Sequence, residues 1–292
     1  MTPLPELRLL RSFGAVCDAG SLSRAAGELH ISQQALSQQL RQLEGLLGVE
    51  LIERTNRGAV PTPAGRTLLV EARKVLIAAE RAVERTLQTA AGHGGSLRLG
   101  HTFTTSSDLV PVITERLAAT APRLQLTTIE MLARDLPGAL ERGEVDVALI
   151  PHADHGDHID TSPAATAALC AAVAAGDPLA DEPHVSLQQL SGRTVHLWPR
   201  DVAPGYYDAV VEAFASAAIA PVLDTSVVGN AVWARIARGP GVGVIAVSQA
   251  PSLPRAIATI PIVPAPPPMR IDLTWRRGDP PASLATIQHA LD

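Results

Sequence analysis

One run of residues, Ser21–Glu44, restricts the fold of this chain more than any other part of the sequence. It is typical of a helix, a tight turn and a second helix. Ser21 or Ser23 is placed to cap the first helix and Ser32 the second, because a serine hydroxyl accepts hydrogen bonds from the first turn of a helix. Small and apolar residues at helical spacing would close the two helices on each other: Ala25, Ala26, Leu29, Ile31, Leu36, Leu40 and Leu43.

The opposite face of the second helix is polar. Glutamine pairs with adenine edges in the major groove of DNA, and serine donates to or accepts from several bases. Arg41 lies one turn further along the helix and is better placed for a phosphate. We expect this face to bind DNA through Ser32, Gln33, Gln34, Ser37, Gln38 and Arg41.

A short two-stranded wing is predicted after this pair of helices. Its strands would flank the turn Thr55–Gly58, with Arg54 and Arg57 near the tip. Arginines at such a tip enter a minor groove or contact phosphates, so both residues are candidates for DNA binding. Thr62 is then placed to cap the long helix that follows.

The stretch from Leu7 to about Gly65 resembles the winged helix-turn-helix of LysR-type transcriptional regulators. The resemblance rests on the ordered spacing of short motifs: Gly20-Ser21-Leu22, Ala25-Ala26, Ser32-Gln33, Ser37, Leu43-Glu44, Gly48, Glu53-Arg54 and Thr62-Pro63-Ala64-Gly65. Gln34 departs from the family's usual proline, which bears on the bases that are read, and Ile52 replaces its usual phenylalanine conservatively. The resemblance implies a dimer that binds an inverted repeat in double-stranded DNA through paired helices.

Residues 63–92 are predicted to form one long linker helix. Apolar residues recur along it with the seven-residue spacing of a helix that pairs with a second copy: Leu69, Ala72, Leu76, Ala79, Val83 and Ala90. The alternative is a single amphipathic helix that packs on its own domain. The family resemblance implies a homodimer and, from two such dimers, a homotetramer.

From Leu97 onward, short strands alternate with helices, which predicts a mainly parallel, right-handed α/β lobe and a second lobe of the same kind. In the first lobe we expect strands at 97–100, 124–130 and 145–150, and helices at 108–120 and 136–142. In the second we expect strands at 168–174, 194–197, 222–228 and 242–247, and helices at 204–220 and 230–239. A strand at 271–275 and a helix at 281–291 would return to the first lobe. The stretches Pro151–Pro163 and Pro261–Pro268 would be the two crossings.

This layout resembles the effector domain of the same family, whose fold is like that of periplasmic binding proteins. The matching motifs, in chain order, are Leu97–Gly100 with Pro111, Arg142–Asp146, Asp177-Pro178-Leu179 and Gly239–Val244. We therefore expect a winged helix-turn-helix at 1–62, the linker helix at 63–92 and a two-lobed α/β effector domain at 93–292. Lobe 1 would comprise 93–162 and 268–292, and lobe 2 would comprise 163–267.

Ligands of such sheets bind at the carboxyl ends of the strands, between the lobes. This rule selects Thr102, Phe103, Thr104, Thr105, Met131, Trp198, Arg200 and Asn230 as effector-binding residues. The threonines precede a helix N-terminus, where hydroxyl and N–H groups favour an anion, although plain helix capping is the alternative. For Arg200 the alternative is a surface or inter-lobe ion pair. The stretch Trp198–Asp208 is similar to the subgroup that controls aromatic-compound catabolism, which implies that the effector is a carboxylate or an aromatic acid.

The composition excludes several other classes of protein. The chain is 46% hydrophobic and 18% charged, so it is neither disordered nor fibrous. Two cysteines, expected to be inert core thiols, cannot form a disulfide framework, which fits a reducing cytosol. No uncharged stretch reaches the roughly 20 apolar residues of a membrane span. We expect a soluble, cytoplasmic protein whose slightly basic first 92 residues permit contact with a polyanion.

Two alternative hypotheses have less support in the sequence. An enzyme or a transport-type binding protein would need catalytic residues in the cleft, and no nucleophile–base pair or catalytic motif occurs, so no cofactor is expected. His152, His155 and His158 crowd one loop with a spacing that suits Zn²⁺ or Ni²⁺, but such loops are usually just solvated. The expected function is therefore a regulator whose effector alters DNA bending or contact with RNA polymerase.

Overall fold

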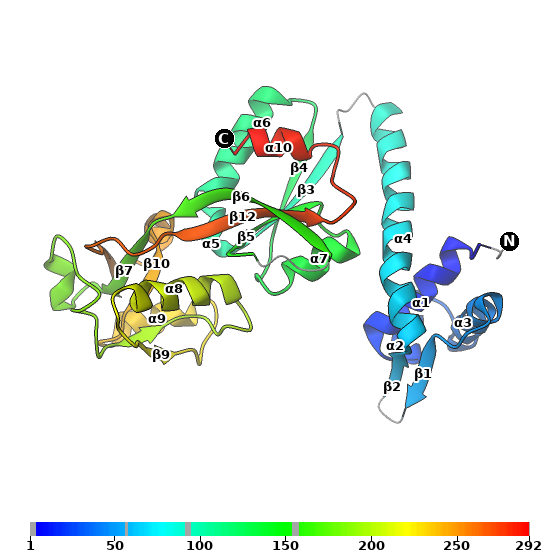
Figure 1. Ribbon diagram of the computed structural model, residues 1–292, viewed down its shortest axis with the longest axis horizontal. Helices are drawn as coiled ribbons and strands as arrows, with labels where there is room; N and C mark the ends of the chain where they lie inside the picture. The colour runs from blue at the N-terminus through cyan, green and yellow to red at the C-terminus, as the bar shows by residue number, and fades with distance from the viewer. Residues whose placement is uncertain (1–3, 56–57, 91–94, 154–157, 292) are drawn as a thin grey trace. The chain divides into compact units, whose positions relative to one another are not determined.

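The structure, a computed structural model, describes residues 4–55, 58–90, 95–153 and 158–291. The chain forms two compact units, residues 1–91 with 141–143 and residues 92–140 with 144–292 (Figure 1). The first unit carries the helix-turn-helix, and the second carries two α/β lobes.

The first unit consists of a helix-turn-helix, a wing and one long helix. Its elements are α1 (Leu7–Ala19), α2 (Leu22–Glu28), α3 (Gln33–Leu47), β1 (Ile52–Thr55), β2 (Gly58–Pro61) and α4 (Pro63–Ala90). Two of the predicted caps are present. The Ser21 hydroxyl accepts from the N–H of Arg24 at 3.5 Å, and that of Ser32 accepts from the N–H of Ala35 at 3.1 Å. The two serines therefore fix where α2 and α3 begin.

The core of the first unit lies where α1, α2, α3 and the start of α4 meet. Leu36, Leu40 and Leu43 of α3 are buried in it, together with Phe13 and Val16 of α1. The three leucines stand at positions i, i+4 and i+7, so they form the single apolar stripe that the sequence predicts. Burial of each of these side chains contributes about 1.5–3 kcal/mol, which is enough to hold α3 with its polar face outward.

The two halves of α4 have different surroundings. Leu69, Ala72 and Leu76 pack into the core of the first unit, so the alternative of an amphipathic helix packed on its own domain describes this half. Val83 and Leu87, in the second half, are 62% and 65% exposed. Among the predicted seven-residue positions, Val83 is thus exposed, whereas Leu69, Ala72 and Leu76 are packed within the unit. No helix in the described part of the chain, α4 included, has the length and apolar character of a membrane span.

The first lobe of the second unit is a five-stranded sheet with the order β4-β3-β5-β12-β6. Its strands are β3 (Ser96–His101), β4 (Gln125–Glu130), β5 (Val147–Pro151), β6 (Ile159–Ala167) and β12 (Met269–Arg276). Its helices are α5 (Phe103–Ser106), α6 (Leu109–Thr120), α7 (Leu136–Arg142) and α10 (Leu284–His289). β3 pairs in parallel with β4 and β5, as predicted, whereas β12 is antiparallel to β5 and β6. The lobe is therefore mixed, because β12 enters it from the second lobe and runs against both neighbours.

The second lobe contains a three-stranded antiparallel sheet, β10-β7-β11, and a parallel pair, β8-β9. Its strands are β7 (Leu169–Ala174), β8 (Thr194–His196), β9 (Val222–Asp224), β10 (Gly243–Ala246) and β11 (Ile257–Pro261). Its helices are α8 (Pro204–Ser216), α9 (Ala231–Arg238) and two short 3-10 helices, Pro178–Asp181 and Val247–Ser252. The repeated parallel plan that the sequence predicts holds for β8, α8 and β9. It also holds just before β10, where Val242 forms a parallel bridge with Val195 of β8. β7 and β11 break the plan, and β11 has no counterpart among the predicted strands.

The first crossing between the lobes differs from the prediction. The stretch Pro151–Pro163 is not the crossing, because Ile159–Ala167 is a strand of the first lobe's sheet and the chain crosses at Ala168. Pro163 lacks an N–H group and would not suit a central strand, but β6 lies at the sheet edge, where such a residue is tolerated. Lobe 1 thus extends through Ala167 rather than ending at residue 162.

Candidate DNA-binding surface and effector pocket

The exposed face of α3 carries the polar residues predicted to bind DNA. Gln33, Gln34 and Arg41 are exposed and, with Ser37, line one shallow hollow in the surface. Gln38 is exposed as well. The Nε of Arg41 donates to the backbone oxygen of Ser37 at 3.3 Å, so the guanidinium lies along its own helix. These hydrogen-bonding side chains therefore share one helix face, which is the arrangement that fits a major groove.

Hydrogen bonds from both strands hold the wing against the helices. Oε1 of Glu44, on α3, accepts from the N–H of Leu51 at 2.9 Å, just before β1, and from that of Ile52, the first residue of β1, at 3.3 Å. The N–H of Ala59, on β2, donates to the carbonyl oxygen of Gly20 at 2.9 Å, in the turn between α1 and α2. Each strand of the wing is thus tied to a different part of the helix-turn-helix, so the wing and α3 are positioned together.

The predicted tip of the wing is described only in part. Arg54 belongs to β1, where it is paired with Ala59, and Arg57 lies outside the described residues. Their role in DNA binding stays a prediction. The predicted cap of the long helix is present, because the Thr62 hydroxyl accepts from the N–H of Gly65 at 3.0 Å.

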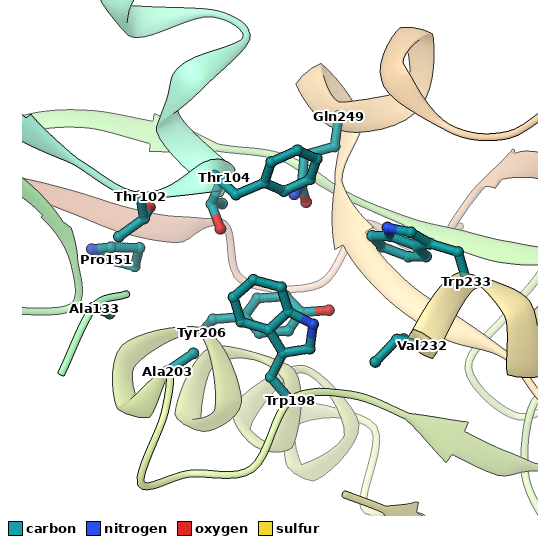
Figure 2. A pocket seen from close by; sticks show the side chains of 11 residues that line it. Thr102, Thr104, Ala133, Pro151, Trp198, Ala203, Tyr206, Val232, Trp233 and Gln249 are labelled. Carbon is teal, nitrogen blue, oxygen red and sulfur yellow. The ribbon is translucent and has the colours of Figure 1, made fainter. Parts of the chain in front are cut away.

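A second candidate site is a cavity between the two lobes of the second unit (Figure 2). It is lined by Thr102, Phe103, Thr104, Ala133, Pro151, Trp198, Ala203, Tyr206, Val232, Trp233 and Gln249. The carboxyl ends of β3 and β5 supply one wall, and the first turns of α8 and α9 supply the other. The cavity encloses about 30 Å³. The cavity is therefore narrow in this structure.

Four of the predicted effector-binding residues line the cavity: Thr102, Phe103, Thr104 and Trp198. The hydroxyl of Thr104 and the indole of Trp198 point into it (Figure 2). Thr105, in contrast, is fully buried and caps α5. Its hydroxyl accepts from the N–H of Thr102 at 3.2 Å and donates to the carbonyl oxygen of that residue at 3.1 Å. Helix capping therefore accounts for Thr105.

The remaining predicted residues lie away from the lining. Arg200 is 64% exposed and forms a two-pronged ion pair with Asp208, in which Nε and a terminal nitrogen each lie 2.8 Å from a carboxylate oxygen. This pair braces the loop before α8 against α8 itself. Met131 packs against a hydrophobic cluster of the first lobe, and Asn230 is exposed at the start of α9. The structure thus brings only half of the predicted effector set together.

Sequence reasoning missed Tyr206, Trp233 and Gln249. The rule of strand ends selects residues that directly follow a strand, whereas Tyr206 and Trp233 lie in the first turns of helices. The hydroxyl of Tyr206 donates to the carbonyl oxygen of Val244 at 2.7 Å, which fixes its ring in the cavity wall. A signal was present in the composition, because the chain has only three Trp, two Tyr and three Phe residues.

The cavity is apolar and uncharged. Among the described residues that line it, none is Asp, Glu, Lys, Arg or His. Burial raises the pKa of Tyr206 far above its ordinary value, so the phenol stays neutral at physiological pH. The site therefore offers aromatic faces, two threonine hydroxyls and the amide of Gln249 to a ligand.

The histidine loop is tied to the sheet of the first lobe. The Nε2 atom of His152 accepts from the N–H of Arg270, on β12, at 2.9 Å. His155 lies outside the described residues. Over the ranges that the structure describes, no three His, Cys, Asp or Glu side chains gather in a way that suits a metal ion. His152 thus has a structural role.

Both cysteines lie in environments that suppress thiolate formation. Burial raises the pKa of Cys170 to about 11. Burial, with the nearby charge of Asp18, raises that of Cys17 to about 12. Because the thiolate is the reactive form of cysteine, both side chains are inert at neutral pH in the folded protein.

The two candidate sites occupy separate units of one chain, one suited to DNA and the other to a small molecule. This separation defines the class of the protein, a DNA-binding transcriptional regulator with an effector-binding domain.

Comparison with known proteins gives the family. Residues 7–66 match the model described as "Bacterial regulatory helix-turn-helix protein, lysR family", and residues 90–292 match "LysR substrate binding domain". The chain belongs to the LysR family of bacterial transcriptional regulators.

Relatives and solved structures match this chain over most of its length. The uncharacterized HTH-type transcriptional regulator YnfL of Escherichia coli K12 is 31% identical over 248 residues, which span 83% of this chain and 82% of that protein. BudR of Raoultella terrigena is 33% identical over 210 residues, which span 71% of this chain and 72% of that protein. The crystal structure of CbnR, a LysR family transcriptional regulator, is 26% identical with a TM-score of 0.73 and 98% of both chains covered. CbnR has also been solved in complex with its target DNA.

Proposed function

We propose that the chain binds an inverted-repeat operator as a dimer, and that a small aromatic acid in the cavity between the lobes modulates this binding or the activation that follows. The lining of the cavity carries the effector part of the proposal. Phe103, Trp198, Tyr206 and Trp233 all contribute to it, which is half of the aromatic residues in the chain. Aromatic side chains pack favourably against other rings, so these walls favour a planar ring.

The polar end of the effector would lie against the first lobe. Thr102 and Thr104 stand at the start of α5 and place their hydroxyl groups on that side of the cavity. Because no described lining residue is basic, a carboxylate there would be held by hydrogen bonds rather than by an ion pair. A second carboxylate would leave a buried charge without a partner, which is costly, so the proposal is a monocarboxylate.

The narrowness of the cavity supplies the coupling between ligand and response. A ring fills more than the enclosed volume of about 30 Å³, so it would enter when the walls move apart. An effector then binds the opened form in preference to the narrow one. A ligand shifts a conformational equilibrium by the difference between its affinities for the two states, and this difference is what would reach the DNA-binding unit.

The DNA-binding part of the proposal depends on α3 and α4. The polar face of α3 would contact base edges in the major groove, while the wing arginines reach the flanking DNA. The exposed Val83 and Leu87 of α4 would pair with a second copy, and two dimers would form a tetramer. Such a regulator would be cytoplasmic, because bacterial DNA lies in the cytoplasm. It would act by bending DNA or by contacting RNA polymerase.

A thermal-shift experiment on the full-length protein tests the effector class. Benzoate, benzamide and cyclohexanecarboxylate separate the contribution of the ring from that of the carboxylate. A ligand at 100 times its Kd stabilises the folded state by about 2.7 kcal/mol, so benzoate is expected to raise the melting temperature most. Thr104→Ala and Trp198→Ala should abolish this rise. Thr114→Ala, on the exposed face of α6, is the matched control and should preserve it. The absence of any shift with millimolar aromatic acids would reject the proposal.

A selection experiment tests the DNA-binding part separately. The protein is used to enrich sequences from a random double-stranded DNA pool, and the enriched sequences are compared. Paired α3 helices predict two inverted half-sites, and binding should weaken steeply with salt because phosphate contacts release counterions. Enrichment of a single unrepeated site would contradict the dimeric arrangement.

A further inference from the structure

We propose that Gly205 sets how closely the two lobes approach and thereby limits the size of the effector that the cavity accepts, an inference that rests on the proposed effector site. Gly205 is the second residue of α8 and is buried. It does not line the cavity, although its neighbours Ala203 and Tyr206 do. Glycine is a poor residue for a helix interior, so its presence here points to a local requirement.

That requirement is the close contact of α8 with the opposite lobe. A Cβ atom added at Gly205 would overlap the carbonyl oxygen of Pro151, at the end of β5, and would lie 3.1 Å from the Cβ of His152. The main obstacle is a backbone atom, which cannot rotate away as a side chain does. Any larger residue at position 205 would therefore push α8 and β5 apart.

The contact lies at the edge of the effector cavity. Pro151 on one lobe and Ala203 on the other both line the cavity, so their separation sets its width. A hydrogen bond nearby, from the N–H of Arg134 to the carbonyl oxygen of Val202, also joins the two lobes, at 3.3 Å. This bond is between backbone groups, whose spacing no side chain changes directly. Gly205 is therefore a position at which an added side chain would change the closed distance.

The expected consequence is a change in ligand size preference. With glycine at position 205 the opened lobes can close back onto a single ring, so that both walls contact it. With alanine the walls rest further apart, so a single ring loses contact with one wall while a fused pair of rings gains access. Trp198 and Trp233, which lie in the walls, also become more accessible to solutes from the solvent.

The first arm of the test measures this accessibility without any effector. Full-length protein carrying Trp275→Phe emits only from Trp198 and Trp233, and acrylamide quenching reports their exposure. Gly205→Ala should raise the quenching constant. Gly176→Ala is the matched control, because an added Cβ there meets nothing within 4 Å, and it should leave quenching unchanged. Unchanged quenching in Gly205→Ala, or an equal rise in both variants, would overturn the proposal.

The second arm measures selectivity with benzoate and 2-naphthoate. Gly205→Ala should shift the ratio of their affinities by about tenfold toward 2-naphthoate, which corresponds to about 1.4 kcal/mol. An equal loss for both acids would indicate a merely structural role and would overturn the proposal. If neither acid binds any variant, the proposed effector class is wrong, and the quenching arm still decides the role of Gly205.

Hydrogen exchange on the unaltered protein covers the case in which Gly205→Ala does not fold. The closed contact predicts that the amide of Arg134 is protected, because its N–H is bonded across the lobes. Protection supports the proposal, and exchange at the rate of a free peptide overturns it.

Discussion

Replacing Gly58 by alanine is expected to detach the wing from the helix-turn-helix. Gly58 has φ +130°, a conformation in which L residues are strained, and an added Cβ would overlap the carbonyl oxygen of Gly20. The N–H of Ala59 donates to that same oxygen at 2.9 Å. Backbone strain of about 1–3 kcal/mol and a lost hydrogen bond of about 1 kcal/mol together predict that the first unit loses about 2–4 kcal/mol of unfolding free energy.

The distribution of tryptophan makes this loss measurable in the whole protein. All three tryptophans, Trp198, Trp233 and Trp275, lie in the second unit, so their fluorescence reports the unfolding of that unit alone. Far-ultraviolet circular dichroism reports the helices of both units. In a denaturant titration, Gly58→Ala should move the circular-dichroism transition to lower denaturant and leave the fluorescence transition in place. Binding to selected DNA should weaken as well, because the wing no longer holds its position beside α3.

Gly27→Ala is the matched control for this prediction. Gly27 is exposed on α2, and an added Cβ there meets nothing within 4 Å, so alanine should stabilise the helix by up to about 1 kcal/mol. The reasoning is refuted if Gly58→Ala stays within about 0.5 kcal/mol of the unaltered protein, which is the range of ordinary surface substitutions. An equal shift of the fluorescence transition would refute it too.

Three further predictions concern charge, thiols and base recognition. Hydrogen bonds from Ser226 lower the pKa of Asp224 from 3.8 to about 2, so its contribution to stability is complete above pH 3.8 and is lost as the pH falls toward 2. Asp224→Asn should remove this part of the pH dependence in urea titrations followed by tryptophan fluorescence. Cys17 and Cys170 should react with iodoacetamide at neutral pH only as fast as the protein unfolds, and rapid labelling would contradict their raised pKa values. Arg41→Ala should weaken binding to all DNA sequences and lower the salt slope by about 1, whereas Gln34→Ala should relax the preference at individual base pairs, which selection and salt titration distinguish.

The elements that local residues specify were predictable from the sequence. Ser32 caps α3, and Leu36, Leu40 and Leu43 bury one stripe of it, so the start and the orientation of that helix follow from short-range patterns. β6 is different, because it contains Pro163 and, among the described strands, pairs with β12 alone, which comes near the end of the chain. A strand that depends on so distant a partner has no local signature, and its proline indicated a crossing instead.

The candidate effector site was predictable where it follows strand ends. Thr102, Thr104 and Trp198 lie where the rule of carboxyl ends places them. Arg200 obeys the same rule in sequence but not in space, because Asp208 lies within reach and forms an ion pair with it. Whether Arg200 binds a ligand carboxylate or the carboxylate of Asp208 depends on how the loop folds. The spacing of the residues in the sequence does not reveal that fold.

The aromatic residues of the chain divide between its cores and the proposed effector site. Phe13 and Phe214 are fully buried, as core residues are, and most of the remaining core consists of Leu, Val, Ile and Ala. Trp198 and Trp233 lie on separate segments of the second lobe and line the same cavity. Trp233 is also a buried member of a cluster with Val232 and Ile236, and Trp198 packs against that cluster, so core packing holds both rings in the cavity wall. A planar ring, as proposed for the effector, would stack on side chains that are already fixed in position.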